Sequence, residues 1–141
     1  MGIAKDLAER HIDMLRQRDV GRVADLYADD GYFSMAGMRV SPGDLPMVMQ
    51  AYLAAFPDIT NKVTGWIESD DGIAVEQVLT ATHLGTWKTP YGELAATGKQ
   101  VQWEAVEVVR VQNNKIASWY SYFDQLPSLI AVGVVPTPPT G

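Results

Sequence analysis

The first part of the chain carries apolar residues at helical spacing. Four residues recur at intervals of four and form one stripe: Ile3, Leu7, His11 and Leu15. This stripe predicts a helix over residues 3–18. Asp19 can cap a second, shorter helix that ends before residues 29–31. A third helix is predicted to begin at residues 41–44 and to end at Phe56, because Pro57 follows it.

Further along the chain the pattern changes to an alternation of apolar and polar residues, which is typical of β-strands. Strands are predicted at residues 63–68, 72–83, 100–111 and 115–124, after a short strand at residues 32–38. The pair Asn113-Asn114 predicts a hairpin turn between the last two strands. Three helices followed by long strands indicate an α+β fold. Residues 1–134 are predicted to form one domain, and residues 135–141, with three prolines, a loose tail.

Ionisable residues interrupt the apolar faces of four predicted elements. In the long strand one face reads Val101, Trp103, Ala105, Glu107, Val109 and Val111. His83 ends a mostly apolar row of the strand 72–83, and His11 shares the apolar stripe of the first helix. In the last strand Asp124 ends a row that holds Tyr120 and Tyr122. Ionisable groups on core-facing positions gather at working sites, so these four together predict a pocket.

Each of these residues also has a purely structural interpretation. His11 and His83 can be hydrogen-bonded core histidines, and Glu107 can bond to a neighbouring strand or helix end. Asp124 can cap a turn or a helix before Leu126-Pro127. The tryptophans fit the core or the pocket rim, and the Phe and Met side chains fit packing first and pocket lining second.

Composition narrows the range of functions. The chain of 141 residues has a formal net charge of −6, which repels phosphate backbones, so no nucleic-acid partner is predicted. No apolar run approaches the ~20 residues of a membrane span, and the N-terminus lacks the apolar segment of a signal peptide. We therefore predict a cytoplasmic protein with no membrane partner. The chain has no cysteine and two histidines, so neither a metal nor another cofactor is predicted.

Several short motifs occur between Phe56 and Gly133 in a characteristic order. They are Phe56-Pro57-Asp58, Thr82-His83-Leu84-Gly85, Thr97-Gly98-Lys99, Val109-Arg110-Val111, Asn114-Lys115-Ile116, Trp119 and Tyr122-Phe123-Asp124-Gln125-Leu126. In order and spacing they resemble the SnoaL-like polyketide cyclases of the nuclear transport factor 2-like superfamily. The segment Leu26-Tyr27-Ala28-Asp29-Asp30 is similar to the wider superfamily, so the resemblance extends over nearly the whole chain.

The resemblance implies a cone-shaped, curved mixed β-sheet wrapped by three N-terminal helices and enclosing an apolar pocket. It also implies a homodimer or homotetramer formed through the outer face of the sheet. Cyclases of this family close a ring by intramolecular aldol addition without a metal or cofactor. Their acid/base aspartate ends the last strand and matches Asp124, and a pocket histidine in their T-H-x-G motif matches His83. In the related ketosteroid isomerases two residues bind the oxyanion, and by spacing His11 and Glu107 of this chain match their positions. The position of the isomerase base, however, is Met35 in this chain.

We therefore predict a cofactor-independent cyclase that acts on a small apolar or aromatic, carbonyl-containing, polyketide-like substrate. The predicted catalytic residues are Asp124 as base, His83 as donor to the enolate oxygen, and Glu107, which with His11 is an alternative donor. The residues predicted to contact the substrate are His11, Tyr32, Met35, Phe56, Trp87, Trp103, Tyr120 and Tyr122.

Two other functions remain open from the sequence. One is an isomerase, dehydratase or epoxide hydrolase on the same fold. The hydrolase layout requires an arginine between two inward carboxylates, whereas Arg110 falls on the opposite strand face from Glu107. The other is a non-catalytic module for small-molecule binding or oligomerisation, in which the ionisable residues are satisfied core groups.

Overall fold

The computed structural model describes residues 2–89, 92–137 and 139. Within these residues the helices are α1 (Ile3–Arg16), the 3-10 helix η1 (Val23–Leu26), α2 (Leu45–Ala55) and α3 (Leu126–Ala131). The strands are β1 (Tyr27–Met35), β2 (Met38–Val40), β3 (Thr60–Ser69), β4 (Gly72–Thr82), β5 (Trp87–Thr89), β6 (Gly92–Leu94), β7 (Gln100–Gln112) and β8 (Lys115–Phe123). The α+β class is confirmed, and the long strands lie where alternation predicted them, within a few residues at their ends.

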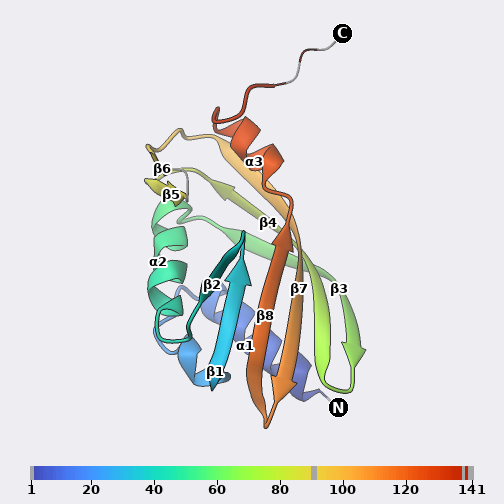
Figure 1. The fold of residues 1–141 in the computed structure, drawn as a ribbon. Helices are drawn as coiled ribbons and strands as arrows, with labels where there is room; N and C mark the ends of the chain where they lie inside the picture. The colour runs from blue at the N-terminus through green and yellow to red at the C-terminus, as the bar shows by residue number, and fades with distance from the viewer. Residues whose placement is uncertain (1, 90–91, 138, 140–141) are drawn as a thin grey trace.

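Six of the strands form one mixed sheet in the order β2-β1-β8-β7-β4-β3. Neighbours are antiparallel except for β1 and β8, which run parallel, while β5 and β6 pair separately. The sheet is strongly curved, and α1 crosses its inner face (Figure 1), where it contacts β3, β4, β7 and β8. The turn Asn113-Asn114 between β7 and β8 has positive φ at both residues, as the hairpin prediction requires.

The helices differ from the prediction in two places. The second helix shrinks to the single turn of η1, because Tyr27 is already extended at the start of β1. The helix α3 follows the last strand, so the helices are not all N-terminal. Six residues are too few to show helical periodicity, and Pro127 in the first turn is tolerated there because a helix leaves its first N–H groups unpaired. Residues 138, 140 and 141 of the predicted tail lie outside the described residues.

A β-bulge in β8 reverses the faces that simple alternation predicts. Val111 pairs with Ile116 and Arg110 with Ser118, so β8 advances two residues where β7 advances one, and Ala117 is the extra residue. A single inserted residue moves every later side chain to the other face. Ile116 and Trp119, three positions apart, are therefore both buried on the inner face.

Two clusters of buried side chains form the core. The larger one lies between α1, α2 and the inner face of the sheet and includes Leu7, Ile12, Phe33, Val75 and Trp119. The smaller one lies at the other end, near the small β5–β6 sheet and α3, and includes Phe56, Ile59, Trp87, Val101 and Trp103. In this second cluster Trp103 Nε1 donates to Ser128 Oγ at 3.0 Å, which fastens α3 to β7.

Gly85 is required where the chain leaves β4 and passes the end of α2. Its N–H donates to the Ala55 carbonyl at 3.1 Å, and a Cβ at this position would overlap the Ala54 carbonyl oxygen. We expect Gly85→Ala to lower the free energy of unfolding by about 1–3 kcal/mol, because backbone must move to relieve the overlap. Urea unfolding followed by tryptophan fluorescence measures this change.

Gly43→Ala is the matched control for Gly85→Ala. Nothing lies within 4 Å of a Cβ built at Gly43, so its unfolding free energy should stay within about 0.5 kcal/mol of wild type. Equal unfolding midpoints for the two variants would show that the approach of α2 does not require a glycine at position 85.

Candidate functional site

A cavity lies between α1, α2 and the inner face of the sheet. Its volume is about 130 Å³. Its wall is mostly apolar, with side chains such as Leu15, Phe33, Met49 and Trp103. The polar lining residues are His11, Tyr52, Asn61, Gln77, Glu107 and Ser121. A few placed polar groups in an apolar wall are typical of small-molecule sites.

Glu107 is the carboxyl group in this wall, and it is 5% exposed. Its Oε1 accepts from Gln77 Nε2 at 2.9 Å and from Ser121 Oγ at 3.1 Å, and its Oε2 accepts from Trp119 Nε1 at 2.7 Å. Burial raises the pKa of Glu107 above its ordinary value, although the three hydrogen bonds act in the opposite direction. A carboxylate can accept about four hydrogen bonds, so room for one more remains.

His11 reaches the same cavity from α1. Its ring stacks on Trp119, with centroids 4.0 Å apart, and its Nε2 lies 3.0 Å from the Tyr27 hydroxyl. Burial lowers the pKa of His11 to about 3, so the ring is neutral near pH 7. Trp119 thus contacts two ionisable groups of the cavity, His11 through its ring face and Glu107 through its N–H.

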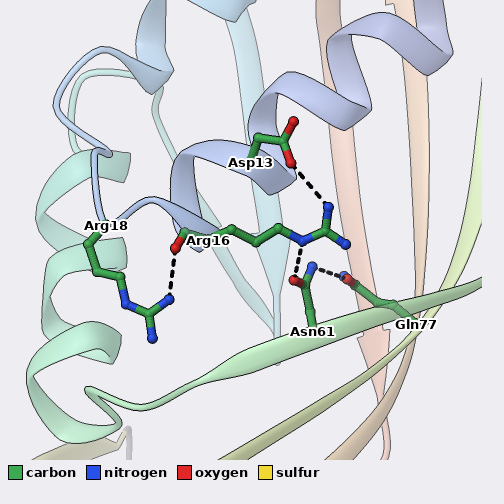
Figure 2. A network of polar contacts seen from close by, with 5 residues as sticks. All are labelled: Asp13, Arg16, Arg18, Asn61 and Gln77. Carbon is green, nitrogen blue, oxygen red and sulfur yellow. Dashed lines mark hydrogen bonds and ion pairs between the residues drawn. The ribbon is translucent and has the colours of Figure 1, made fainter.

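A row of hydrogen-bonded polar side chains connects Glu107 with the surface. Gln77 Oε1 accepts from Asn61 Nδ2 at 2.9 Å, and Asn61 Oδ1 accepts from Arg16 Nε at 2.7 Å. Figure 2 shows the part of this row from Gln77 to Arg16, with Arg16 at the end of α1 also bonded to Asp13. The site therefore joins a buried carboxyl group to an exposed guanidinium through two amides.

Four of the residues predicted for the site line this cavity: His11, Met35, Trp103 and Glu107. Phe56, His83 and Trp87 are buried, but they pack against one another in or beside the second cluster and do not line the cavity. His83 Nδ1 lies 3.0 Å from Thr97 Oγ1, and its Nε2 has no hydrogen-bond partner among the described residues. The structure thus separates His83 from Glu107.

The prediction that Tyr120, Tyr122 and Asp124 share the inner face is wrong beyond the β8 bulge. Tyr120 and Tyr122 stack on each other on the outer face, where Tyr120 also bonds to Tyr32. Asp124 is exposed, and its Oδ1 accepts from the Leu126 N–H at 3.1 Å at the start of α3. Assembly through this outer face and the cytoplasmic location stay predictions.

Several cavity residues were missed by the sequence analysis. Trp119 and Ser121 were missed because of the bulge, and Asn61 because β3 begins before the predicted strand. Gln77 could have been predicted from the sequence, because it interrupts the apolar face of β4 between Val75 and Leu79, as Glu107 does in β7.

In residues 2–89, 92–137 and 139, no group of three or more His, Asp or Glu side chains is placed to hold a metal ion. No helix in the part of the chain that the structure describes is long and apolar enough to cross a membrane.

The sequence matches a protein-family model over most of its length. The model is that of the SnoaL-like polyketide cyclases, and the match covers residues 5–131. No curated protein matches the sequence.

Solved structures with different described activities share the fold. AclR, a candidate hydroxylase from Streptomyces galilaeus, has 25% identity and a TM-score of 0.83, with 99% of this chain and 86% of that chain covered. IdmH, a candidate polyketide cyclase from Streptomyces antibioticus, has 20% identity and a TM-score of 0.73, with 92% and 98% covered. An LEH-like epoxide hydrolase from M. tuberculosis has 15% identity and a TM-score of 0.69, with 94% and 90% covered.

The low pKa of His11 predicts a specific loss of stability in acid. The unfolded chain takes up this proton near the ordinary pKa of 6.5, whereas the folded protein does so near about 3. The contribution of neutral His11 is therefore complete above 6.5 and is lost as the pH falls toward 3, by at most about 1.4 kcal/mol per pH unit. Urea unfolding of wild type and His11→Phe across this range gives the difference in slope.

In His11→Phe the ring can still stack on Trp119 but cannot take up a proton. Its unfolding free energy should fall less steeply with decreasing pH than that of wild type, because the other acidic groups titrate alike in both proteins. Loss of the bond to Tyr27 shifts the whole curve without changing its slope. Parallel curves would contradict a buried, neutral His11.

Proposed function

Because the chain belongs to the SnoaL-like polyketide cyclase family, we propose that it is a cofactor-independent acid/base enzyme acting on a carbonyl substrate. The reaction takes place in the cavity between α1, α2 and the sheet, which is the binding pocket. The proposal is supported above all by the surroundings of Glu107. Its carboxyl group is buried in an apolar cavity wall, has a raised pKa and has room to accept one more hydrogen bond.

Glu107 serves as the base that removes a proton from a carbon next to the substrate carbonyl. A raised pKa brings a carboxylate closer to the working pH, which strengthens it as a base and lets it return the proton later. Its three hydrogen bonds fix the position of the carboxyl group before the substrate binds. Glu107 takes this part in place of Asp124, whose carboxylate lies at α3 and not in the cavity wall.

Tyr52 of α2 serves as the donor to the enolate oxygen. Tyr52 lines the cavity, and a phenolic hydroxyl can donate a hydrogen bond. Burial raises the pKa of Tyr52, which keeps the hydroxyl protonated at neutral pH. Tyr52 replaces His83 in this role because it lines the cavity.

Ring closure then needs no further reagent. The C–H bond breaks and its proton goes to Glu107; the enolate carbon attacks a second carbonyl of the same molecule and forms the new C–C bond. The resulting alkoxide takes the proton back from Glu107. A pocket that folds a flexible chain so that its two ends meet supplies much of the rate enhancement.

The volume of the cavity limits the substrate. Sites for drug-sized ligands measure roughly 300–1,000 Å³, while an apolar cavity of roughly 150 Å³ admits benzene. The present 130 Å³ therefore fits a molecule that closes a single ring better than a substrate of several fused rings. Heptane-2,6-dione, which closes to a six-membered ring by an aldol step, is a suitable probe.

A second candidate function is ligand binding without catalysis. It is favoured by the three hydrogen bonds to Glu107, which already satisfy both oxygens of the carboxyl group. In that case the cavity binds the same small carbonyl compounds, but no bond is made.

Glu107→Gln separates these functions. Turnover of heptane-2,6-dione by wild type, measured by gas chromatography of the cyclic product, should fall at least about 100-fold in Glu107→Gln, because an amide cannot accept the proton. Binding, measured by quenching of tryptophan fluorescence, should change little, since Trp119 and Trp103 still line the cavity.

Asp124→Asn is the matched comparison, because it makes the same chemical change outside the cavity wall. It should keep activity within about threefold of wild type. The opposite result, with Asp124→Asn inactive and Glu107→Gln active, would return the base to the end of β8. Saturable binding without product from any of the three proteins would favour the binding module.

A further inference from the structure

The hydrogen bonds between Arg16 and Glu107 all point in one direction. Arg16 donates to Asn61, Asn61 donates to Gln77, and the Gln77 amide then donates to the buried carboxylate. A guanidinium has only donors and an ionised carboxylate has only acceptors, so the two ends of the row are fixed by chemistry. The two amides between them can each turn over and exchange their oxygen and nitrogen.

The donor at the surface end decides how both amides are turned. Because Arg16 can only donate, Asn61 must present its oxygen to it and its NH₂ to Gln77. Gln77 must then present its own oxygen to Asn61, which leaves its NH₂ for Glu107. If the row were reversed, the Gln77 oxygen would face the carboxyl group and could bond to it only when Glu107 is protonated.

We propose that Arg16 is a positioning residue: through the two intervening amides, it determines that an N–H donor faces the Glu107 carboxylate. Its catalytic consequence rests on the proposed function of Glu107. The effect travels through amide orientation, because Arg16 is exposed, with 43% of its side chain accessible, and solvent screens the direct attraction between exposed and buried charges.

Neighbouring residues hold both Arg16 and Asn61 in place for the hydrogen bond between them. Arg16 Nη1 donates to Asp13 Oδ1 at 3.1 Å, one turn earlier on α1. Arg18 Nη1 donates to the Arg16 carbonyl at 2.9 Å, while its Nη2 donates to the carbonyls of Pro57 and Ile59. Arg18 thereby ties the end of α1 to the segment that leads into Asn61 (Figure 2 shows the first of these bonds).

The other groups that face Glu107 carry no charge near neutral pH. Gln77 on β4 and both Trp119 and Ser121 on β8 do not titrate in this range. Burial keeps His11 of α1 neutral, and it holds the pKa of Tyr27 on β1 well above its ordinary value. Tyr52 of α2 lines the same cavity and is likewise protonated. On β7 itself the neighbouring charged residues, Glu104 and Arg110, are exposed.

Substitutions at Arg16 test the proposal through the pKa of Glu107 in the free protein. Carbon-13 NMR of the glutamate carboxyl groups, with Glu107→Gln to assign the signal, follows this pKa directly. Arg16→Met removes the donor, so the amides are free to turn and the pKa of Glu107 should rise by about one unit. Arg16→Glu offers only acceptors, so it should reverse the row and raise the pKa further. Arg16→Lys retains a donor and should stay closest to wild type.

Arg10 provides matched controls on the same helix. It is exposed, is paired with Asp6, and shows no bond to the amide row. Arg10→Met and Arg10→Glu change the net charge by the same amounts as the Arg16 variants and should leave the Glu107 pKa unchanged. Equal shifts from the two positions would overturn the proposal, because they would show a general charge effect instead of amide orientation.

Activity provides the second readout and separates this inference from the proposed function. The pH at which turnover of heptane-2,6-dione is half-maximal should move upward in Arg16→Met together with the NMR pKa, and return in Arg16→Lys. A shift in the NMR pKa without turnover in any protein supports the role of Arg16 and rejects catalysis by Glu107. Turnover that depends on Glu107, with a pKa indifferent to Arg16, rejects the role of Arg16 alone.

Discussion

The hydrogen bonding of one buried carboxyl group constrains the sheet on both sides. A carboxylate removed from water needs donors at its oxygens, and Glu107 obtains them from both neighbouring strands. Gln77 reaches it from β4, while Trp119 and Ser121 reach it from β8. The pairing of Glu107 with Ser121 across β7 and β8 is therefore more than a matter of apolar packing, since a slip of one residue would turn the donors outward.

The bulge at Ala117 belongs to the same constraint. Without it, strict alternation from Ile116 would place Tyr120 beside the inner face and Trp119 outside. With it, the indole of Trp119 covers His11 with its ring and donates to Glu107 with its N–H. Bulges commonly re-aim side chains beside functional sites, and this one brings His11 and Glu107 onto one aromatic side chain.

Sequence periodicity predicted the features that depend on local spacing. The apolar stripe of α1 and the alternation in β7 placed His11 and Glu107 on inner faces, and both line the cavity. Alternation could not predict an inserted residue, so Asp124 was assigned to the wrong face. His83 was correctly predicted to be buried, but burial alone does not tell which of two core clusters a side chain joins. That depends on tertiary packing at the end of α2, around Phe56.

The number of polar groups that form hydrogen bonds near Glu107 bears on whether this residue serves stability alone. If the position served stability alone, an apolar residue of similar volume would pack against Trp119 and need no donors, and such replacements of buried charges are often neutral or stabilising. Instead, Gln77, Ser121 and Asn61 occupy the cavity wall as polar residues, and the bonds of Gln77 and Asn61 lead to a guanidinium at the surface. An arrangement in which each amide orients the next gives the group at its end a defined hydrogen-bond partner. In the proposed mechanism the group at that end, Glu107, takes up and releases a proton, so the partner it is given bears on the chemistry.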